Sequence, residues 1–231
     1  MLKSKLRLKA LNMMLMQRYS LIWDCCCDHG LLGMSLLQKH QAEKVIFVDI
    51  LAHQMNTLET KLTKYFPLNQ FDWEVRCQDV KTVIVPDVAP QLFIIAGVGA
   101  FQTIEFIKSL YASAQGVEFD LLVCTVHGSH AVRQALIRLG FKLKSERIIV
   151  ENNRFYEGLY VSTVGDERIV STGNTMWNWS DPLHQKYWEK LINHYTKKAA
   201  TDPDQFQPVL AQYTSLTQKG TDCYQPNASL V

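Results

Sequence analysis

Short apolar runs alternate with amphipathic segments from about residue 19 to residue 140. The runs are Tyr19 to Trp23, Lys44 to Asp49, Asp72 to Cys77, Gln91 to Ala96 and Asp120 to Thr125. Between them, apolar residues recur at the spacing of a helix face. The helices expected on this pattern begin at Leu31 and cover Leu51 to Phe66, Phe101 to Tyr111, and Ser129 to Leu139, with Gly140 as the C-cap. Strands that alternate with helices at this period predict a parallel sheet.

The alternation ends with two β-rich runs in succession, Lys142 to Glu151 and Arg154 to Val164. Asn152 and Asn153 join them, and this pair suits a tight hairpin turn. The fold expected is therefore α/β, with a mostly parallel sheet of seven strands that ends in an antiparallel hairpin. Such an ending is typical of Rossmann-like class I methyltransferase sheets and uncommon in NAD-binding domains, whose two halves repeat one βαβ unit. An NAD-linked enzyme is the weaker interpretation.

The composition changes after Gly165. A polar stretch with Trp177 and Trp179 leads to two expected helices, Pro182 to Ala200 and Pro203 to Gln218, each with proline in its first turn. We therefore expect residues 1–165 to form the main domain and residues 166–231 to form a linker and a helical hairpin. The chain from Thr221 onward is expected to be a loose tail.

Basic residues gather in two stretches although the formal net charge is only +2. The first accompanies an amphipathic helix expected over residues 5–18, and the second lies further along the chain. They comprise Lys3, Lys5, Arg7, Lys9 and Arg18, and then Arg133, Arg138, Lys142, Lys144, Arg147 and Arg154. Each stretch is either a solvated helix face or part of a phosphate-binding surface.

Cysteine usage argues for a reducing environment. Cys25, Cys26 and Cys27 are adjacent, and the other cysteines are scattered without the spacing of a disulfide framework or a zinc site. We expect a cytoplasmic protein that binds no metal. No apolar run approaches the length of a membrane span, so no membrane partner is expected.

The turn from Asp24 to Gly30, between the first strand and the first helix after it, is the predicted floor of a cofactor site. Backbone N–H groups at such a turn face the pocket at the carboxyl ends of the strands. Asp24, Asp49 and Asp79 follow the first three strands. An acid after the second strand suits ribose hydroxyls, and Asp79 suits an adenine amine. Asp24 either orients the turn or meets a cationic group. Each acid has an alternative role as a helix N-cap.

Three residues are candidates for contact with a substrate. Asp28 and His29 lie on the same turn, where Asp28 either meets substrate or caps the helix and His29 either takes part in catalysis or packs. His127 follows the fifth strand, at the expected opening of the pocket. No serine, histidine and carboxylate constellation is evident.

Five segments together resemble the TrmK-type tRNA (adenine-N1) methyltransferases. They are Asp24-x-x-x-Asp28-His29-x-x-Leu32, Asp49, Val75-Arg76-x-x-Asp79, Ile94-x-Ala96-Gly97-x-Gly99 and Phe155-Tyr156-Glu157. The likeness runs from about Leu6 to Gly165. The chain departs from the family at Cys26, where the family has Gly, and at Thr125-Val126-His127.

The resemblance implies S-adenosylmethionine as cofactor and methylation of adenine 22 of tRNA. The expected cofactor residues are Asp24, Cys26, Asp28, His29, Asp49, Asp79, Ala96 and Gly97. Asp28, His29, Gly97 and His127 are the expected catalytic residues, and Gly97 is expected beside the reactive methyl group. The basic N-terminal helix and the C-terminal hairpin are the expected tRNA contacts. The alternative is a methyltransferase-like RNA-binding protein without turnover.

Overall fold

The computed structural model describes residues 6–221 and divides the chain into two compact units, Met1–Thr175 and Met176–Val231. The strands of the first unit are β1 (Tyr19–Cys25), β2 (Ala42–Asp49), β3 (Asp72–Cys77), β4 (Gln91–Ala96), β5 (Asp120–Cys124), β6 (Lys142–Glu151) and β7 (Arg154–Ser162). Its helices are α1 (Leu6–Asn12), α2 (Leu31–Gln38), α3 (Ala52–Tyr65), the short 3-10 helix η1 (Val80–Thr82), α4 (Ala100–Ala114) and α5 (Ser129–Arg138).

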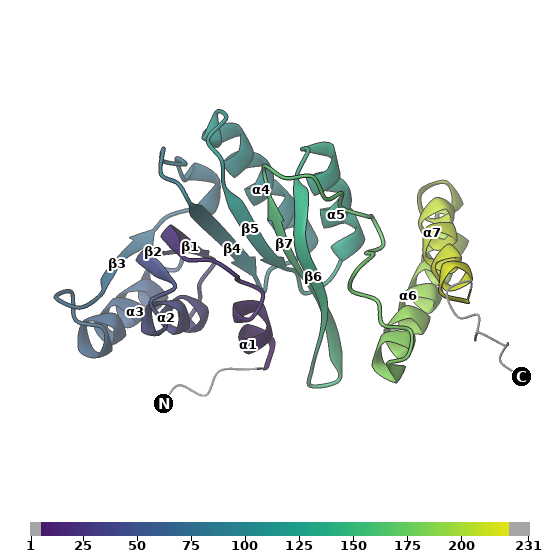
Figure 1. The fold of residues 1–231 in the computed structure, drawn as a ribbon, viewed down its shortest axis with the longest axis horizontal. Coiled ribbons are helices and arrows are strands. Elements are labelled where there is room, and N and C mark those ends of the chain that lie inside the picture. Colours follow the sequence, from purple (N-terminus) through teal and green to yellow (C-terminus); the bar gives the residue numbers. More distant parts are fainter. Residues whose placement is uncertain (1–5, 222–231) are drawn as a thin grey trace, which may run out of the picture. The chain divides into compact units, whose positions relative to one another are not determined.

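Within the described residues the strands form one seven-stranded sheet in the order β3-β2-β1-β4-β5-β7-β6 (Figure 1). The first five strands are parallel, and β7 runs antiparallel to both of its neighbours. Asn152 and Asn153 turn the chain between β6 and β7 with φ of 50° and 58°. Two successive residues with positive φ make the tight turn whose twist matches that of the flanking strands. The predicted mostly parallel sheet with a terminal antiparallel hairpin is confirmed.

Both faces of the sheet are buried because the strand residues alternate between two hydrophobic clusters. Trp23 and Cys25 of β1 pack with residues of α4 and α5, whereas Ile22 packs with residues of α1, α2 and α3. The same alternation holds along β4, where Phe93 and Ile95 belong to the first cluster and Leu92 and Ile94 to the second. Continuous apolar runs are typical of strands covered on both faces.

The N-terminal helix is shorter than the prediction of residues 5–18: α1 ends at Asn12, and residue 5 lies outside the described residues. The N–H groups of Met14 and Leu15 donate to carbonyl groups three residues back, so the chain leaves the helix in a tight turn. Asn12 is buried, and its side chain donates to the hydroxyl of Ser35 at 2.8 Å. This bond joins the end of α1 to α2.

A buried ion-pair network joins α5 to the terminal hairpin. The Arg133 guanidinium lies 2.6 Å from Glu146 Oε2 and 2.8 Å from Glu157 Oε2, and all three side chains are inaccessible to solvent. Lys144, from the same predicted basic stretch, pairs with Asp120 at 2.7 Å. Both alternatives for this stretch, a solvated helix face and part of a phosphate-binding surface, are therefore wrong for Arg133, because its side chain is buried and neighbouring carboxylates neutralise its charge.

The second unit contains α6 (Pro182–Thr201) and α7 (Pro203–Thr221). Tyr195 of α6 stacks on Tyr213 of α7, with ring centroids 5.3 Å apart, and Trp188 donates its indole N–H to the Tyr213 carbonyl. Trp177 stacks on Trp179 and on Tyr187 of α6, so both tryptophans of the polar stretch pack within this unit. The predicted tail, residues 222–231, lies outside the described residues.

The division between the units falls after Thr175, whereas the sequence predicts it after Gly165. Residues between these positions return to the sheet. Glu146 on β6 accepts hydrogen bonds from the backbone N–H groups of Asn174 and Thr175, at 2.5 and 2.7 Å. A buried glutamate thus holds the segment on the first unit, a contact that polar composition does not reveal.

Candidate active site

Two hollows open at the carboxyl ends of the central strands. β1 leads to α2 on one face of the sheet, and the neighbouring β4 leads to α4 on the other, so the chain diverges here and leaves a crevice. The Arg7 hollow, of ≈ 660 Å³, is lined by Arg7, Leu8, Asp24, Cys26, Cys27, Asp28, His29, Leu31, Leu32, Ala96 and Gly97. The Phe101 hollow, of ≈ 680 Å³, is lined by Cys26, Asp49, Ile50, Asp79, Val80, Lys81, Phe101, Gln102, Glu105 and Phe106.

Asp24 brings a buried carboxyl group to the Arg7 hollow. The residue is 4% exposed, and its Oδ2 accepts a hydrogen bond from the N–H of Gly33 at 2.9 Å. Burial raises the pKa of Asp24 to about 7; the Gly33 bond opposes this rise, and the negative charge of Asp49 adds to it. A neighbouring cation would favour the ionised form. Asp24 therefore orients the turn and also presents a titratable group to the hollow.

Asp49 links the end of β2 to the turn that follows β1. Its Oδ2 accepts a hydrogen bond from the N–H of Asp28 at 3.2 Å, and its Oδ1 accepts one from the N–H of Leu51 at 3.1 Å. The second bond closes a turn just before α3, whose N-cap residue is Leu51 and not Asp49. A carboxylate oxygen can accept two hydrogen bonds, and each Asp49 oxygen accepts one here. Asp49 therefore retains acceptor capacity toward the Phe101 hollow.

Apolar side chains form much of the Phe101 hollow around its carboxylates. Phe101 is 78% exposed and Ile50 is 65% exposed, whereas Phe106 is buried behind them. Asp79 caps η1 by accepting from the N–H of Lys81 at 2.9 Å, and it also pairs with the Lys81 ammonium at 3.3 Å. Apolar walls with a few polar groups suit a ligand that combines a flat ring with hydrogen-bond donors.

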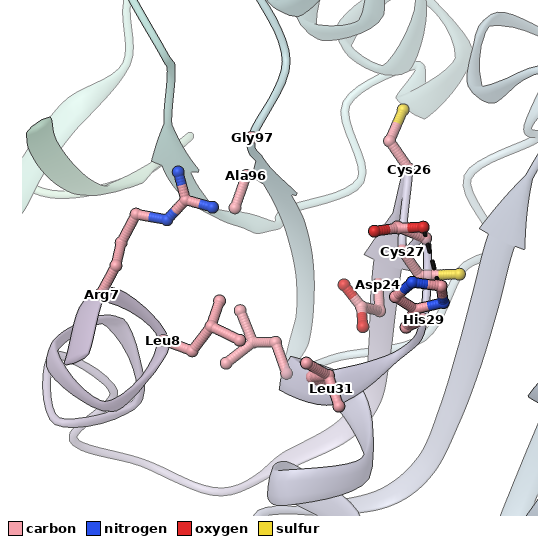
Figure 2. Close-up of a pocket in the computed structure, with 11 residues that line it drawn as sticks. Arg7, Leu8, Asp24, Cys26, Cys27, His29, Leu31, Ala96 and Gly97 are labelled. Carbon is pink, nitrogen blue, oxygen red and sulfur yellow. Dashed lines mark ion pairs between the residues drawn. The ribbon is translucent and has the colours of Figure 1, made fainter. Parts of the chain in front are cut away.

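Cys26 lies where the two hollows meet, since it lines both. Its φ of 54° is in the left-handed region, which favours glycine. Figure 2 shows its side chain pointing away from Arg7, Leu8 and Asp24. Burial raises the pKa of its thiol to about 12, and the negative charges of Asp49, Asp24 and Asp79 add to the rise. The thiol is therefore neutral near pH 7 and occupies space between the hollows.

Arg7 reaches from α1 toward the ends of the central strands (Figure 2). Its guanidinium lies 4.7 Å from the centre of the Tyr156 ring, and a Cβ on Gly97 would lie 3.7 Å from its Nη2. Its backbone N–H donates to Glu151 Oε1 at 3.0 Å. Sequence reasoning counted Arg7 among the basic residues of the first helix and not among the site residues.

The family model described as a methyltransferase domain matches residues 4–159. The chain belongs to this methyltransferase-domain family. The matched region includes both hollows and ends within β7. No curated protein matches the chain in the corresponding comparison.

Solved structures show the same fold over nearly the whole chain. TrmK of M. capricolum, in complex with S-adenosyl-homocysteine, has a TM-score of 0.73 at 16% identity, covering 92% of this chain and 97% of that one. The B. subtilis m1A22 tRNA methyltransferase TrmK has a TM-score of 0.70 at 18% identity, covering 94% and 97%. Streptococcus pneumoniae Sp1610, in complex with S-adenosyl-L-methionine, has a TM-score of 0.66 at 16% identity, covering 92% and 97%. The predicted Rossmann-like methyltransferase fold is confirmed.

The methyltransferase domain brings together the residues that the sequence predicts for the cofactor. Asp24, Asp28, His29, Ala96 and Gly97 line the Arg7 hollow, and Asp49 and Asp79 line the Phe101 hollow, with Cys26 in both. His29 is exposed and lies 3.8 Å from the Asp28 carboxylate. His127 is outside both sets of lining residues, and a Cβ added to Gly99 would lie 3.1 Å from its ring.

Several lining residues are not among those the sequence predicts, notably Ile50, Phe101 and Phe106 of the Phe101 hollow. Two of them could have been found from their positions in the sequence. Ile50 directly follows the acid that ends β2, and Phe101 follows the glycines after β4. Among the described residues, no helix is long and apolar enough to cross a membrane. Within the same part of the chain, no group of three metal-ligating side chains converges.

Replacing Cys26 with glycine tests the strain in the turn of the methyltransferase domain. We expect Cys26→Gly to be more stable than Cys26→Ala by about 1 kcal/mol, because alanine retains the Cβ that disfavours positive φ. Thermal denaturation of both variants measures this difference. Since Gly also removes the side chain between the hollows, its affinity for S-adenosyl-homocysteine should exceed that of the wild type by calorimetry. Equal stability of the two variants would show that the turn is unstrained.

Proposed function

We propose that this protein is an S-adenosylmethionine-dependent methyltransferase that modifies N1 of an adenine in tRNA, at position 22 by resemblance to the TrmK family. The observation that carries the proposal is the pair of hollows meeting at Cys26, at the point where β1 and β4 diverge. Ligands bind at this point in open α/β sheets. The methyltransferase-domain match and the folds of the TrmK proteins support the same conclusion.

The lining residues fit the two ends of this cofactor. We assign the adenosine end to the Phe101 hollow, where Phe101 and Ile50 offer apolar surface, Asp49 serves the ribose hydroxyls and Asp79 serves the adenine amine. The other end belongs to the Arg7 hollow, which holds the Asp24 carboxyl group. Cys26 would lie against the middle of the cofactor.

The cofactor, when bound, supplies a methyl group on a positively charged sulfur. Adenine N1 has its own lone pair, so the chain does not have to remove a proton before transfer. The task of the residues is to align the reacting atoms and to exclude water. Ala96 and Gly97 at the end of β4 are small, and Gly97 adopts a φ of 98° that side chains disfavour. They leave room for a target base, which has to leave its stack at a cost of a few kcal/mol.

We assign the tRNA contacts to exposed basic side chains on both units. Lys9 on α1 and Arg18 before β1 are exposed, whereas Lys3 and Lys5 lie outside the described residues. α6 of the second unit carries Lys186, Lys190, Lys197 and Lys198, with Glu189 as its acidic residue. Phosphate contacts of this kind supply affinity for nucleic acid without sequence specificity.

A second candidate is an RNA-binding protein without turnover. The observation that favours it is the side chain of Cys26 between the hollows, at a backbone conformation where bare glycine would leave more space. In that case tRNA binds while the cofactor does not. The two candidates differ in one measurable property, the transfer of a methyl group.

Incubation of the protein with unmodified tRNA transcripts and methyl-labelled S-adenosylmethionine tests the proposal. We expect label in the tRNA, with 1-methyladenosine detected by mass spectrometry of its nucleosides and mapped to position 22. A transcript with guanine at that position is the matched control and should remain unlabelled. Binding of tRNA without any transfer of label would support the second candidate. Label on another base would preserve the activity and overturn the assigned target.

A further inference from the structure

The hairpin of β6 and β7 extends past β5 at the edge of the sheet where the two hollows open. β7 pairs with β5 as far as Leu159, and beyond this residue it continues to pair with β6. Because β7 runs antiparallel to β5, the continuation passes the carboxyl end of β5. Arg147 and Gly158 form the first of its five residue pairs, and Glu151 and Arg154 form the last. Five pairs span about 17 Å at the usual rise of a strand. We call this two-stranded ribbon the overhang (Figure 1).

The hairpin buries its carboxylates and exposes its arginines. Its three glutamates, Glu146, Glu151 and Glu157, are 8%, 9% and 1% exposed. Arg147 and Arg154 are exposed, and no ion pair of the described residues involves either of them. The charge that the overhang presents to solvent is therefore positive, and its surface suits an anionic partner.

Both exposed arginines lie on the face of the overhang that adjoins the Arg7 hollow. Arg147 precedes Ile149 by two residues, and Arg154 precedes Tyr156 by two, so each shares a face of the ribbon with its apolar neighbour. Ile149 and Tyr156 belong to the hydrophobic cluster that α1 covers. The guanidinium of Arg7, which lines the hollow, lies 4.7 Å from the centre of the Tyr156 ring. The overhang thus forms a basic wall beside the candidate active site.

Helices on both faces hold the overhang in place. On one face the backbone N–H of Arg7 in α1 donates to Glu151 Oε1 at 3.0 Å. On the other face Glu157 binds the buried guanidinium of Arg133 in α5 at 2.8 Å. Groups on a ribbon fixed in this way lose little entropy when a partner binds.

Resting on the proposed function, we propose that the overhang binds the phosphate backbone of the RNA strand beside the target base, through Arg147 and Arg154. Four residue positions separate the two arginines along the ribbon, about 14 Å, so they contact different phosphates of one strand. A guanidinium binds phosphate through two parallel hydrogen bonds, which fixes the strand in one orientation. The second basic stretch of the sequence is thus divided by the fold: Arg133 lies in the core, and Arg147 and Arg154 face the RNA.

Binding of an unmodified tRNA transcript across a salt series tests the assignment. The double variant Arg147→Met with Arg154→Met should bind about tenfold more weakly, and its plot of log affinity against log salt concentration should be shallower by about 1 to 2. The corresponding lysine double variant keeps both charges and should retain most of the slope. The matched control is Arg138→Met with Arg168→Met, which removes the same net charge from exposed positions on α5 and opposite Lys142, at the other end of β6. The control should bind as the wild type does.

Methylation kinetics and calorimetry separate this role from a disturbance of the active site. We expect the methionine double variant to raise KM for tRNA about tenfold, with kcat and the affinity for S-adenosyl-homocysteine within about twofold of the wild type. Weaker binding of S-adenosyl-homocysteine would overturn the assignment, because it indicates an effect on the hollow and not on the RNA.

The outcomes also distinguish the overhang from the proposed function. If the wild type methylates tRNA while the methionine double variant and the control behave alike, the role of the overhang is overturned and the activity stands. If the wild type binds tRNA without transferring a methyl group, the proposed function fails, and a shallower salt slope of the double variant still supports the overhang. If the wild type binds no tRNA, both fail.

Discussion

At pH 8 the Asp24→Asn variant is expected to be more stable than the wild type. The raised pKa of Asp24, about 7, means that its ionisation opposes folding, because the unfolded chain carries the charge in water at no such cost. Asparagine removes the charge and retains an oxygen that accepts the Gly33 N–H. The gain in the free energy of unfolding should be up to about 4 kcal/mol, measured by urea denaturation.

The pH dependence of this gain has a definite sign. Below about pH 3 the carboxyl group is neutral in both the folded and the unfolded state, so the variant and the wild type should have equal stability. As the pH rises to about 7, the unfolded state loses its proton while the folded state keeps it, and the wild type becomes less stable. Above that pH the difference should stay constant.

Binding of S-adenosylmethionine should change in the opposite direction, with Asp24→Asn weaker by about 10- to 100-fold at pH 8 because an ammonium loses its charged partner. For the wild type, affinity should rise from pH 6 to pH 8 as Asp24 ionises. Asp28→Asn is the matched control, since it removes an exposed carboxylate from the same hollow. Its stability should stay within about 0.5 kcal/mol. An Asp24→Asn variant that is less stable than wild type at pH 8 would contradict the role given to its charge.

The Arg133→Met variant is expected to lose about 3–5 kcal/mol of the free energy of unfolding, because it leaves Glu146 and Glu157 buried without their cation. Methionine replaces the aliphatic part of the arginine side chain, so the main loss is that of the guanidinium with its charge and its hydrogen bonds. Chemical denaturation followed by circular dichroism measures the effect. Adding Glu157→Gln to Arg133→Met should recover part of the lost stability, because the double variant buries one unpaired carboxylate instead of two.

Arg138→Met is the control for this network. Arg138 lies on the same helix and is exposed, so its replacement should change stability by less than about 0.5 kcal/mol. A small effect of Arg133→Met itself would mean that the glutamates bind protons at little cost in its absence. In that case the variant should be markedly less stable at high pH than at low pH, which a denaturation series across pH would reveal.

The placement of the three acids at one edge of the sheet was predictable because it follows from strand order and residue type. Asp24 belongs to the end of β1, Asp49 ends β2, and Asp79 follows β3 closely. The carboxyl ends of parallel strands share one edge of a sheet, so acids at these positions face the same crevice wherever the strands pair. The hairpin was also predictable from local sequence, because two asparagines in succession favour the turn that joins β6 to β7.

Other features depended on contacts between residues far apart in the sequence. The burial of Arg133 requires glutamates from β6 and β7, and the bond between Asn12 and Ser35 joins α1 to α2. Charge counts along the chain treat every arginine alike, although one is neutralised in the interior and another, Arg7, faces a hollow. His127 shows the converse. It follows β5, at the expected opening of the pocket, yet it is not among the residues that line either hollow.

The sequence by itself determined the layered α/β fold, the terminal hairpin and the acids around the crevice, because periodicity, turn chemistry and position after a strand are local properties. Only the tertiary structure decided that Cys26 separates two hollows, that Arg7 shares one of them with Asp24, and that Arg133 is part of the core. These three features depend on which surfaces meet when the helices pack on the sheet. The electrostatic energy of a charged side chain depends on that packing more than on the residue type.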